Sequence, residues 1–285
     1  KVLDGTYREF LMHQSVGFET VFVLAGNHEF YRTEYNAGRA ALASLCKEVT
    51  EALDGAPTVH FMDCARVDLP GTEVRILGCT LWSNVDDASV EVVARTLSDY
   101  NAIRVTGSEA QVAAKATVAD TNAWHARELA WLESEIAQAT LDGRRCVVLT
   151  HHGPTFHGTC PPAHVGSAAS AGFCTSLERL LRPPVTAWLF GHTHWSSWQR
   201  YRAATDGTDV GRWWTLSGGA LGGGPSCAEL MSPSSECDAQ CAGDVLVASN
   251  QVGYGAKGEH RKSRCHPRML LAISADGGRV ALRCA

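Results

Sequence analysis

The chain has 285 residues, of which 45% are hydrophobic and 19% are charged, and its formal net charge at pH 7 is −5. These totals are typical of a globular protein with a substantial core. They argue against a nucleic-acid-binding protein with an overall basic field, and no apolar run reaches the ~18 residues that a membrane-spanning helix needs.

Two amphipathic helices are predicted in the first part of the chain, over residues 3–15 and 36–53. In the second of these, apolar residues recur every three or four positions from Leu42 to Leu53. Asn36 precedes this pattern and has a side chain suited to an N-cap.

Short apolar runs predict the buried strands of a sheet that is covered on both faces. They are TVFVLA (20–25), VRILGC (74–79), CVVLT (146–150) and TAWLF (186–190). Between the second and third runs, residues 108–140 have helical spacing, in which Trp124, Leu129, Leu132 and Ile136 could share one face.

Beyond Gly191 the pattern is strand-like and contains no long helix. Strands are predicted in RWWTLS (212–217), DVLVAS (244–249), RMLLAIS (268–274) and RVALR (279–283), and the last two are joined by the hairpin signal ADGG. Residues 222–243 are rich in Ser, Pro, Gly and Cys, which is typical of a surface insertion. With no convincing linker, residues 1–285 are predicted to form a single layered α/β domain.

Histidines follow three of the predicted strands. VFVLA runs into Gly26, Asn27 and His28; CVVLT runs into His151 and His152; and AWLF runs into the segment that contains His192 and His194. Because ligands of open α/β sheets bind beyond the carboxyl ends of the strands, these side chains are expected to converge. Imidazole and amide oxygen donors suit zinc, iron and manganese, so the pattern favours a metal centre.

The motifs G-N-H-E, H-H-x-P and G-H-x-H, in this order, resemble the later motifs of the calcineurin-like metallophosphoesterases. The resemblance extends over roughly residues 20–255 through GNHEFY, GCTLWS, LSDYNAIR, HARELAWLESEI, VVLTHHGPT, WLFGHTHWS and VASNQVGY. It implies a four-layered α-β-β-α sandwich with two mixed sheets and a binuclear metal site at the carboxyl ends of the strands.

The same resemblance implies roles for individual residues. Asn27, His151 and His192 would bind one divalent metal and His194 the other, while His28 would act catalytically beside the phosphoryl group with Asn27. His152 could replace His151 as a ligand, or it could face the substrate, as could Asn250. The implied function is hydrolysis of phosphomonoesters or phosphodiesters by a metal-bridging hydroxide, with two Mn, Fe or Zn ions as cofactors and a phosphorylated substrate of unknown class.

The chain departs from the family pattern before Gly26, where the family's D-x-H and G-D motifs are missing. The chain begins at Lys1 rather than at a methionine, and its opening stretch is typical of the middle of a helical region. We therefore expect an N-terminally truncated enzyme that lacks its first strands, and that could be inactive by itself. A non-catalytic scaffold or binding protein that retains the fold is the alternative, and the oligomeric state is left open.

The cysteines allow other interpretations. Their 11 positions lack the regular spacing of a disulfide scaffold, which favours a reducing, cytoplasmic location. Cys227, Cys237 and Cys241 could pair with one another or hold zinc with His266. Cys160 or Cys174 with His164 could form a cysteine hydrolase site, although no orienting Asn or Asp lies nearby in the sequence.

Overall fold

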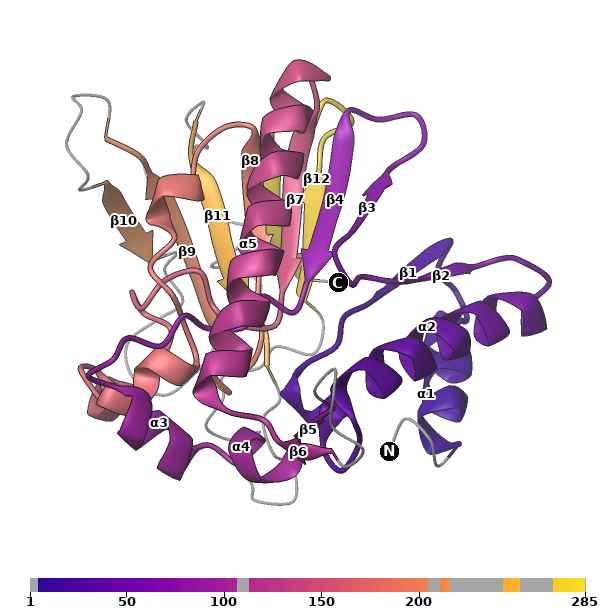
Figure 1. Ribbon diagram of the computed structural model, residues 1–285. Coiled ribbons are helices and arrows are strands. Elements are labelled where there is room, and N and C mark those ends of the chain that lie inside the picture. The colour runs from indigo at the N-terminus through magenta and orange to yellow at the C-terminus, as the bar shows by residue number, and fades with distance from the viewer. Residues whose placement is uncertain (1–4, 107–112, 205–210, 216–242, 252–268, 285) are drawn as a thin grey trace.

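A seven-stranded mixed sheet lies at the centre of the computed structural model, which describes residues 5–106, 113–204, 211–215, 243–251 and 269–284 (Figure 1). The strand order is β10-β9-β11-β8-β7-β4-β3. In this sheet β4, β7, β8 and β11 run parallel, whereas β3 and β9 run antiparallel to their neighbours β4 and β11. The strands span Ala65–Asp68 (β3), Val74–Cys79 (β4), Arg145–Thr150 (β7), Val185–Leu189 (β8), Ser197–Arg202 (β9), Arg212–Thr215 (β10) and Val245–Ser249 (β11).

Both faces of this sheet are buried. Successive strand residues point to opposite faces, so Val148 and Trp188 pack against helix α5 (Val118–Leu141) in one core cluster, while Val147 and Ala187 belong to a second cluster on the other side. Figure 1 shows α5 in front of the sheet and β12 behind it. Because both faces are buried, the sequences of these strands are continuous apolar runs rather than alternating apolar and polar residues.

Two short ladders cover the face opposite α5. Strands β1 (Thr20–Val23) and β2 (Thr58–Phe61) pair in parallel, and β12 (Met269–Ile273) pairs with β13 (Val280–Cys284) as the predicted antiparallel hairpin. Helices α1 (Thr6–Ser15) and α2 (Tyr35–Ala52) pack on β1 and β2 through Leu11, Leu45 and Val49. The order of layers is therefore helix, strand ladder, large sheet and helix, which confirms the predicted α/β class.

Short elements connect these layers. They are the helices α3 (Val90–Thr96) and α4 (Asp99–Ala102), the strands β5 (Arg104–Val105) and β6 (Ala114–Lys115), and the 3-10 helices η1 (Asn27–Phe30), η2 (Pro162–His164), η3 (Ala168–Gly172) and η4 (Glu178–Leu180). In the described part of the chain, no helix is both long enough and apolar enough to cross a membrane.

Two predicted helix starts were wrong. The helix expected from residue 108 begins only at Val118, where Thr117 and Asp120 form a reciprocal capping box, and β6 precedes it. Asn36 is not the N-cap of α2, because the side chain of Glu34 accepts a hydrogen bond from Ala37 N at 2.8 Å. The predicted insertion lies outside the described residues apart from Gly243.

Candidate metal centre at the strand ends

The carboxyl ends of strands from both layers meet at one place. Strand β1 leads into Asn27, β7 into His151, and β8 into His192. Backbone hydrogen bonds hold these ends together, because Thr80 O accepts from His151 N at 3.1 Å and Gly191 N donates to His151 O at 3.0 Å. The predicted convergence is therefore present, although Asn27 comes from a ladder separate from the large sheet.

Three of the predicted ligands place donor atoms at the point of convergence. His151 Nε2 lies 3.0 Å from Asn27 Oδ1 and 3.1 Å from His192 Nδ1. A neutral imidazole with its proton on Nε2 could donate to only one of these two acceptors at a time. A cation placed among the three atoms could instead accept a lone pair from each of them, so their chemistry fits a metal.

A glycine at position 26 allows this close approach. A Cβ atom on Gly26 would lie only 2.5 Å from His151 Cε1, whereas one on Gly191 would make an ordinary contact with His151 Nδ1 at 3.4 Å. Gly26 has φ near −95°, which any residue can adopt, so the need for glycine there is steric. The ring of His151 therefore occupies the space that a side chain at position 26 would fill.

Asp99 fixes the orientation of Asn27. The Asn27 amide donates from Nδ2 to Asp99 Oδ1 at 2.7 Å, and the Tyr31 hydroxyl donates to the same oxygen at 2.6 Å. Asp99 is only 2% exposed. These bonds turn Oδ1 of Asn27 toward the histidines, as a metal ligand requires, and they engage its NH₂ group away from the centre.

The electrostatics of the centre favour neutral imidazoles. Burial lowers the pKa of His151 well below its ordinary value, and the neighbouring His192 lowers it further. Burial also lowers the pKa of His192 to about 4, a shift that the Asp99 carboxylate partly opposes. Metal ions bind neutral imidazole, so the rings are in the protonation state suited to ligation near neutral pH.

His152 lies behind the centre rather than in the convergence of donor atoms. It is buried, its ring lies 4.2 Å from that of His192 and 5.2 Å from that of Trp82, and its Nδ1 has no hydrogen-bond partner among the described residues. His192 Nε2 is likewise buried and unpartnered within the described part of the structure. The geometry favours His151 over His152 as the ligand, while a role of His152 toward the substrate stays a prediction.

His28 and His194 lie at the edge of the centre. The His28 ring stacks on Tyr31 with 4.3 Å between centroids, and charge on His28 or His194 would lower the pKa of His151. His192 and His194 both have positive φ angles, of 68° and 53°. Non-glycine residues with such angles are strained and gather at functional sites, which agrees with a constrained ligand loop.

The side chain of Gln251 supports this loop. Gln251 Oε1 accepts from His194 N at 2.7 Å, and its Nε2 donates to Thr193 Oγ1 at 2.8 Å. Asn250 is exposed just beyond β11, and its predicted contact with substrate stays untested. Glu29 accepts from Gly26 N at 2.8 Å, in the helix-start role that its position in the motif indicates.

The donor atoms that converge here would suit a single metal ion. Asn27, His151 and His192 supply a coherent ligand set, with His194 nearby. Among the described residues, however, no group of three His, Cys, Asp or Glu side chains is placed to hold a metal. The binuclear centre therefore stays a prediction.

The cysteine hydrolase interpretation finds no support in the geometry. Burial raises the pKa of Cys174 to about 12 and also raises that of Cys160, so both are thiols near neutral pH rather than nucleophilic thiolates. Cys174 Sγ donates to Thr159 Oγ1 at 3.5 Å. The cluster Cys227, Cys237, Cys241 and His266 lies outside the described residues.

Comparisons with known proteins identify the family and the fold of this chain. The sequence profile described as calcineurin-like phosphoesterase matches residues 2–196, a range that contains all three histidine-bearing junctions. The chain is 25% identical over 205 residues to the uncharacterized protein L509 of Acanthamoeba polyphaga mimivirus, covering 68% of each chain. Its structure is similar to that of the phosphopantetheinyl hydrolase PptH of Mycobacterium tuberculosis, with a TM-score of 0.53, 14% identity, and coverage of 91% of this chain and 78% of that one. This structural likeness shows a shared fold.

Proposed function

This chain belongs to the calcineurin-like phosphoesterase family, and we propose that it is a metal-dependent hydrolase of phosphomonoesters or phosphodiesters. The observation that carries the proposal is the convergence of three donor atoms. His151 Nε2 lies 3.0 Å from Asn27 Oδ1 and 3.1 Å from His192 Nδ1. These residues would hold a divalent cation such as Mn, Fe or Zn, with His194 as a ligand of a second one. Bound cations would supply Lewis acidity and charge neutralisation toward the phosphoryl oxygens.

The chain's own groups have distinct parts in this reaction. Hydrolysis joins a water oxygen to phosphorus and breaks the ester P–O bond, and the departing alkoxide takes up a proton. His28, at the edge of the centre, would stabilise the developing charge or give that proton to the departing oxygen. Asn27 would act through its oxygen, because its NH₂ group is engaged by Asp99 and Tyr31.

The proposal is tested by metal-dependent release of p-nitrophenol from p-nitrophenyl phosphate and bis(p-nitrophenyl) phosphate. We expect turnover that a chelator abolishes, that Mn, Fe or Zn restores, and that His192→Ala reduces by at least about 10²-fold. Calorimetric titration with Mn²⁺ should show a matching loss of affinity. His13→Ala is the matched control, because His13 is an exposed histidine of α1.

Turnover that survives both the chelator and His192→Ala would overturn the proposal. The scaffold alternative predicts instead a stable complex with a protein partner that is unaffected by either treatment. A cytoplasmic location is part of the proposal. It is supported by the cysteines that are free thiols in the described part of the chain, which are Cys46, Cys64, Cys79, Cys146, Cys160 and Cys174.

A further inference from the structure

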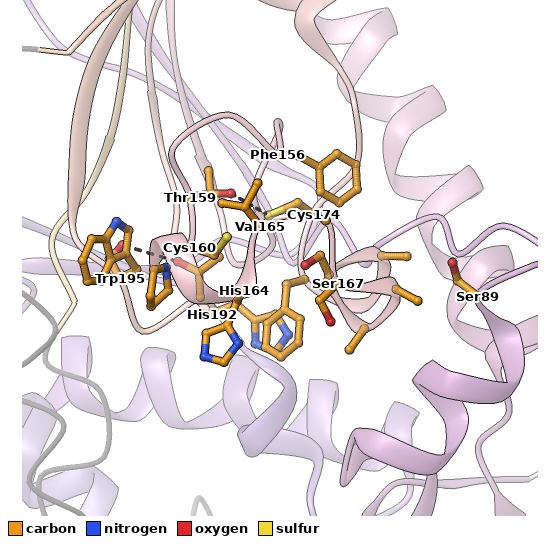
Figure 2. A pocket seen from close by; sticks show the side chains of 18 of the residues that line it. Ser89, Phe156, Thr159, Cys160, His164, Val165, Ser167, Cys174, His192 and Trp195 are labelled. Atoms are coloured by element: carbon orange, nitrogen blue, oxygen red, sulfur yellow. Dashed lines mark hydrogen bonds between the residues drawn. The ribbon is translucent and has the colours of Figure 1, made fainter.

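A cavity of about 990 Å³ opens beside the candidate metal centre, and His192 and His194 line it. Most of its lining comes from the segment between β7 and β8, including η2 and η3. Figure 2 shows Val165, Cys160 and His192 gathered around this space. Phe173, which also lines it, stacks on the His192 ring with 4.6 Å between centroids. The cavity and the metal centre therefore share a wall.

The lining exposes apolar side chains to solvent. Phe156 is 42% exposed and Val165 is 74% exposed, and both are among the large apolar residues that the described surface leaves uncovered. Covering such surface with an apolar group is favourable by about 25 cal/mol per Å². A cavity of this size that adjoins convergent polar groups has the features of a small-molecule site.

The lining, as far as the structure describes it, contains no lysine or arginine to pair with a second anionic group. A carboxylate, Asp86, lies among them, and its Oδ1 accepts from Ser89 N at 2.8 Å. A second phosphate bound there would lose water without gaining a lysine or arginine partner, and it would approach a like charge.

We propose that this cavity binds the organic part of the substrate, so that the enzyme acts on small phosphoesters whose alcohol portion is uncharged and largely apolar. The phosphoryl group would lie at Asn27, His151 and His192, and the alcohol portion would extend past Phe173 toward Phe156 and Val165. This inference rests on the proposed phosphoesterase function. It adds that substrates with a further phosphate on the alcohol side are disfavoured.

The test compares two double variants that add the same charge. Phe156→Lys/Val165→Lys alters the cavity, and Val16→Lys/Phe18→Lys is the control, because Val16 and Phe18 are 73% and 62% exposed and do not line the cavity. Wild type should have a kcat/KM for 1-naphthyl phosphate at least about tenfold above that for naphthalene-1,5-diyl bisphosphate, an ester of the same kind of alcohol that carries a second phosphate. The cavity variant should reduce this ratio by about tenfold, and the control should leave it unchanged.

A second measurement does not depend on turnover. The neutral dye N-phenyl-1-naphthylamine should bind the metal-free wild type and the control equally, and the cavity variant several-fold more weakly. Equal behaviour of the two double variants in both measurements, or equal wild-type activity on 1-naphthyl phosphate and naphthalene-1,5-diyl bisphosphate, would overturn the inference. If no ester is hydrolysed but only the cavity variant loses dye binding, the apolar site stands and the proposed function fails.

Discussion

The two sides of His192 are built in opposite ways. On one side, Asn27 and Asp99 are 5% and 2% exposed and are joined through their polar groups by hydrogen bonds of 3.2 Å or less. On the other side, the cavity is open, and its rim includes the exposed Phe156 and Val165. A buried polar network tolerates little change, because each lost partner leaves an unsatisfied group, whereas exposed apolar side chains can be exchanged at small cost. Under the proposed function, substitutions on the buried side should alter the chemistry, and substitutions around the cavity should alter substrate choice.

The largest effect is expected for Gly26→Ala, which alters the polar side of His192, formed by Asn27, His151 and Asp99. The new Cβ would lie 2.5 to 2.8 Å from three atoms of the His151 ring, so the ring must move away from Asn27 and His192. We expect kcat/KM for p-nitrophenyl phosphate to fall by about 10²-fold, because a displacement of about 1 Å at a catalytic site can have that effect. Overpacking should also cost about 1–3 kcal/mol of stability, measured by urea unfolding.

The matched control for this change is Gly278→Ala. A Cβ there would meet its nearest atom, Asp276 Oδ1, at 3.5 Å, which is an ordinary contact. Both variants add one methyl group, so only the first should change activity. Full activity of Gly26→Ala would show that the His151 position is not needed, and the polar side would then be as tolerant as the cavity.

Asp99→Ala should have a smaller effect on activity. It removes the acceptor for both Asn27 Nδ2 and the Tyr31 hydroxyl, which frees the Asn27 amide to rotate. Changes in residues that orient a metal ligand typically reduce affinity or activity by about 10–100-fold, and we expect a value near the lower end. The measurements are kcat and KM for p-nitrophenyl phosphate and Mn²⁺ affinity by calorimetry.

The conservative variant distinguishes positioning from general stability. Asp99→Asn keeps an acceptor oxygen at the same place, so it should restore most of the Mn²⁺ affinity that Asp99→Ala loses. A loss of thermal stability without any change in Mn²⁺ affinity would assign Asp99 a structural role alone.

The metal-ligand candidates of the polar side are easier to predict from the sequence than the residues and strands that support them. His151 and His192 could be placed because each follows an apolar run, and parallel strands bring their carboxyl ends together. Asp99 could not be identified this way, since its partners lie 72 and 68 positions away and a lone carboxylate in a short helix has the pattern of a surface residue. Strand β9 was also missed, because its sequence SWQRYR is polar although Gln199 and Arg200 are 2% and 5% exposed.

The cavity was harder still to predict. Its lining comes largely from loops and short 3-10 helices, which have no hydrophobic period to detect. Val165 and Phe156 acquire meaning only through their position beside His192. The motifs that identify the family thus lie mainly at the strand ends, whereas the cavity is lined by segments whose sequence carries little pattern.

Glu128 lies behind the polar side and supports the turn at Leu81. Its carboxylate is fully buried on α5 and accepts from Leu81 N at 2.6 Å. Leu81 has a positive φ of 48°, and the next residue, Trp82, packs near His152. Glu128 thus holds a strained turn that forms the back wall of the polar side.

This support should weaken as the pH rises. Burial raises the pKa of Glu128 from 4.5 to about 7, although Arg127 partly opposes the shift. Between these values the folded chain holds a proton that the unfolded chain has released, so this group's contribution is fully present below pH 4.5 and is lost as the pH rises through about 7. Glu128→Gln removes the titration, so its stability relative to wild type should rise by about 3 kcal/mol from pH 4.5 to pH 8. Urea unfolding across this range is the measurement, with Glu133→Gln, a more exposed carboxylate on the same helix, as the control. If the free energies of unfolding of Glu128→Gln and wild type change with pH in the same way, the turn is held without a buried proton on Glu128.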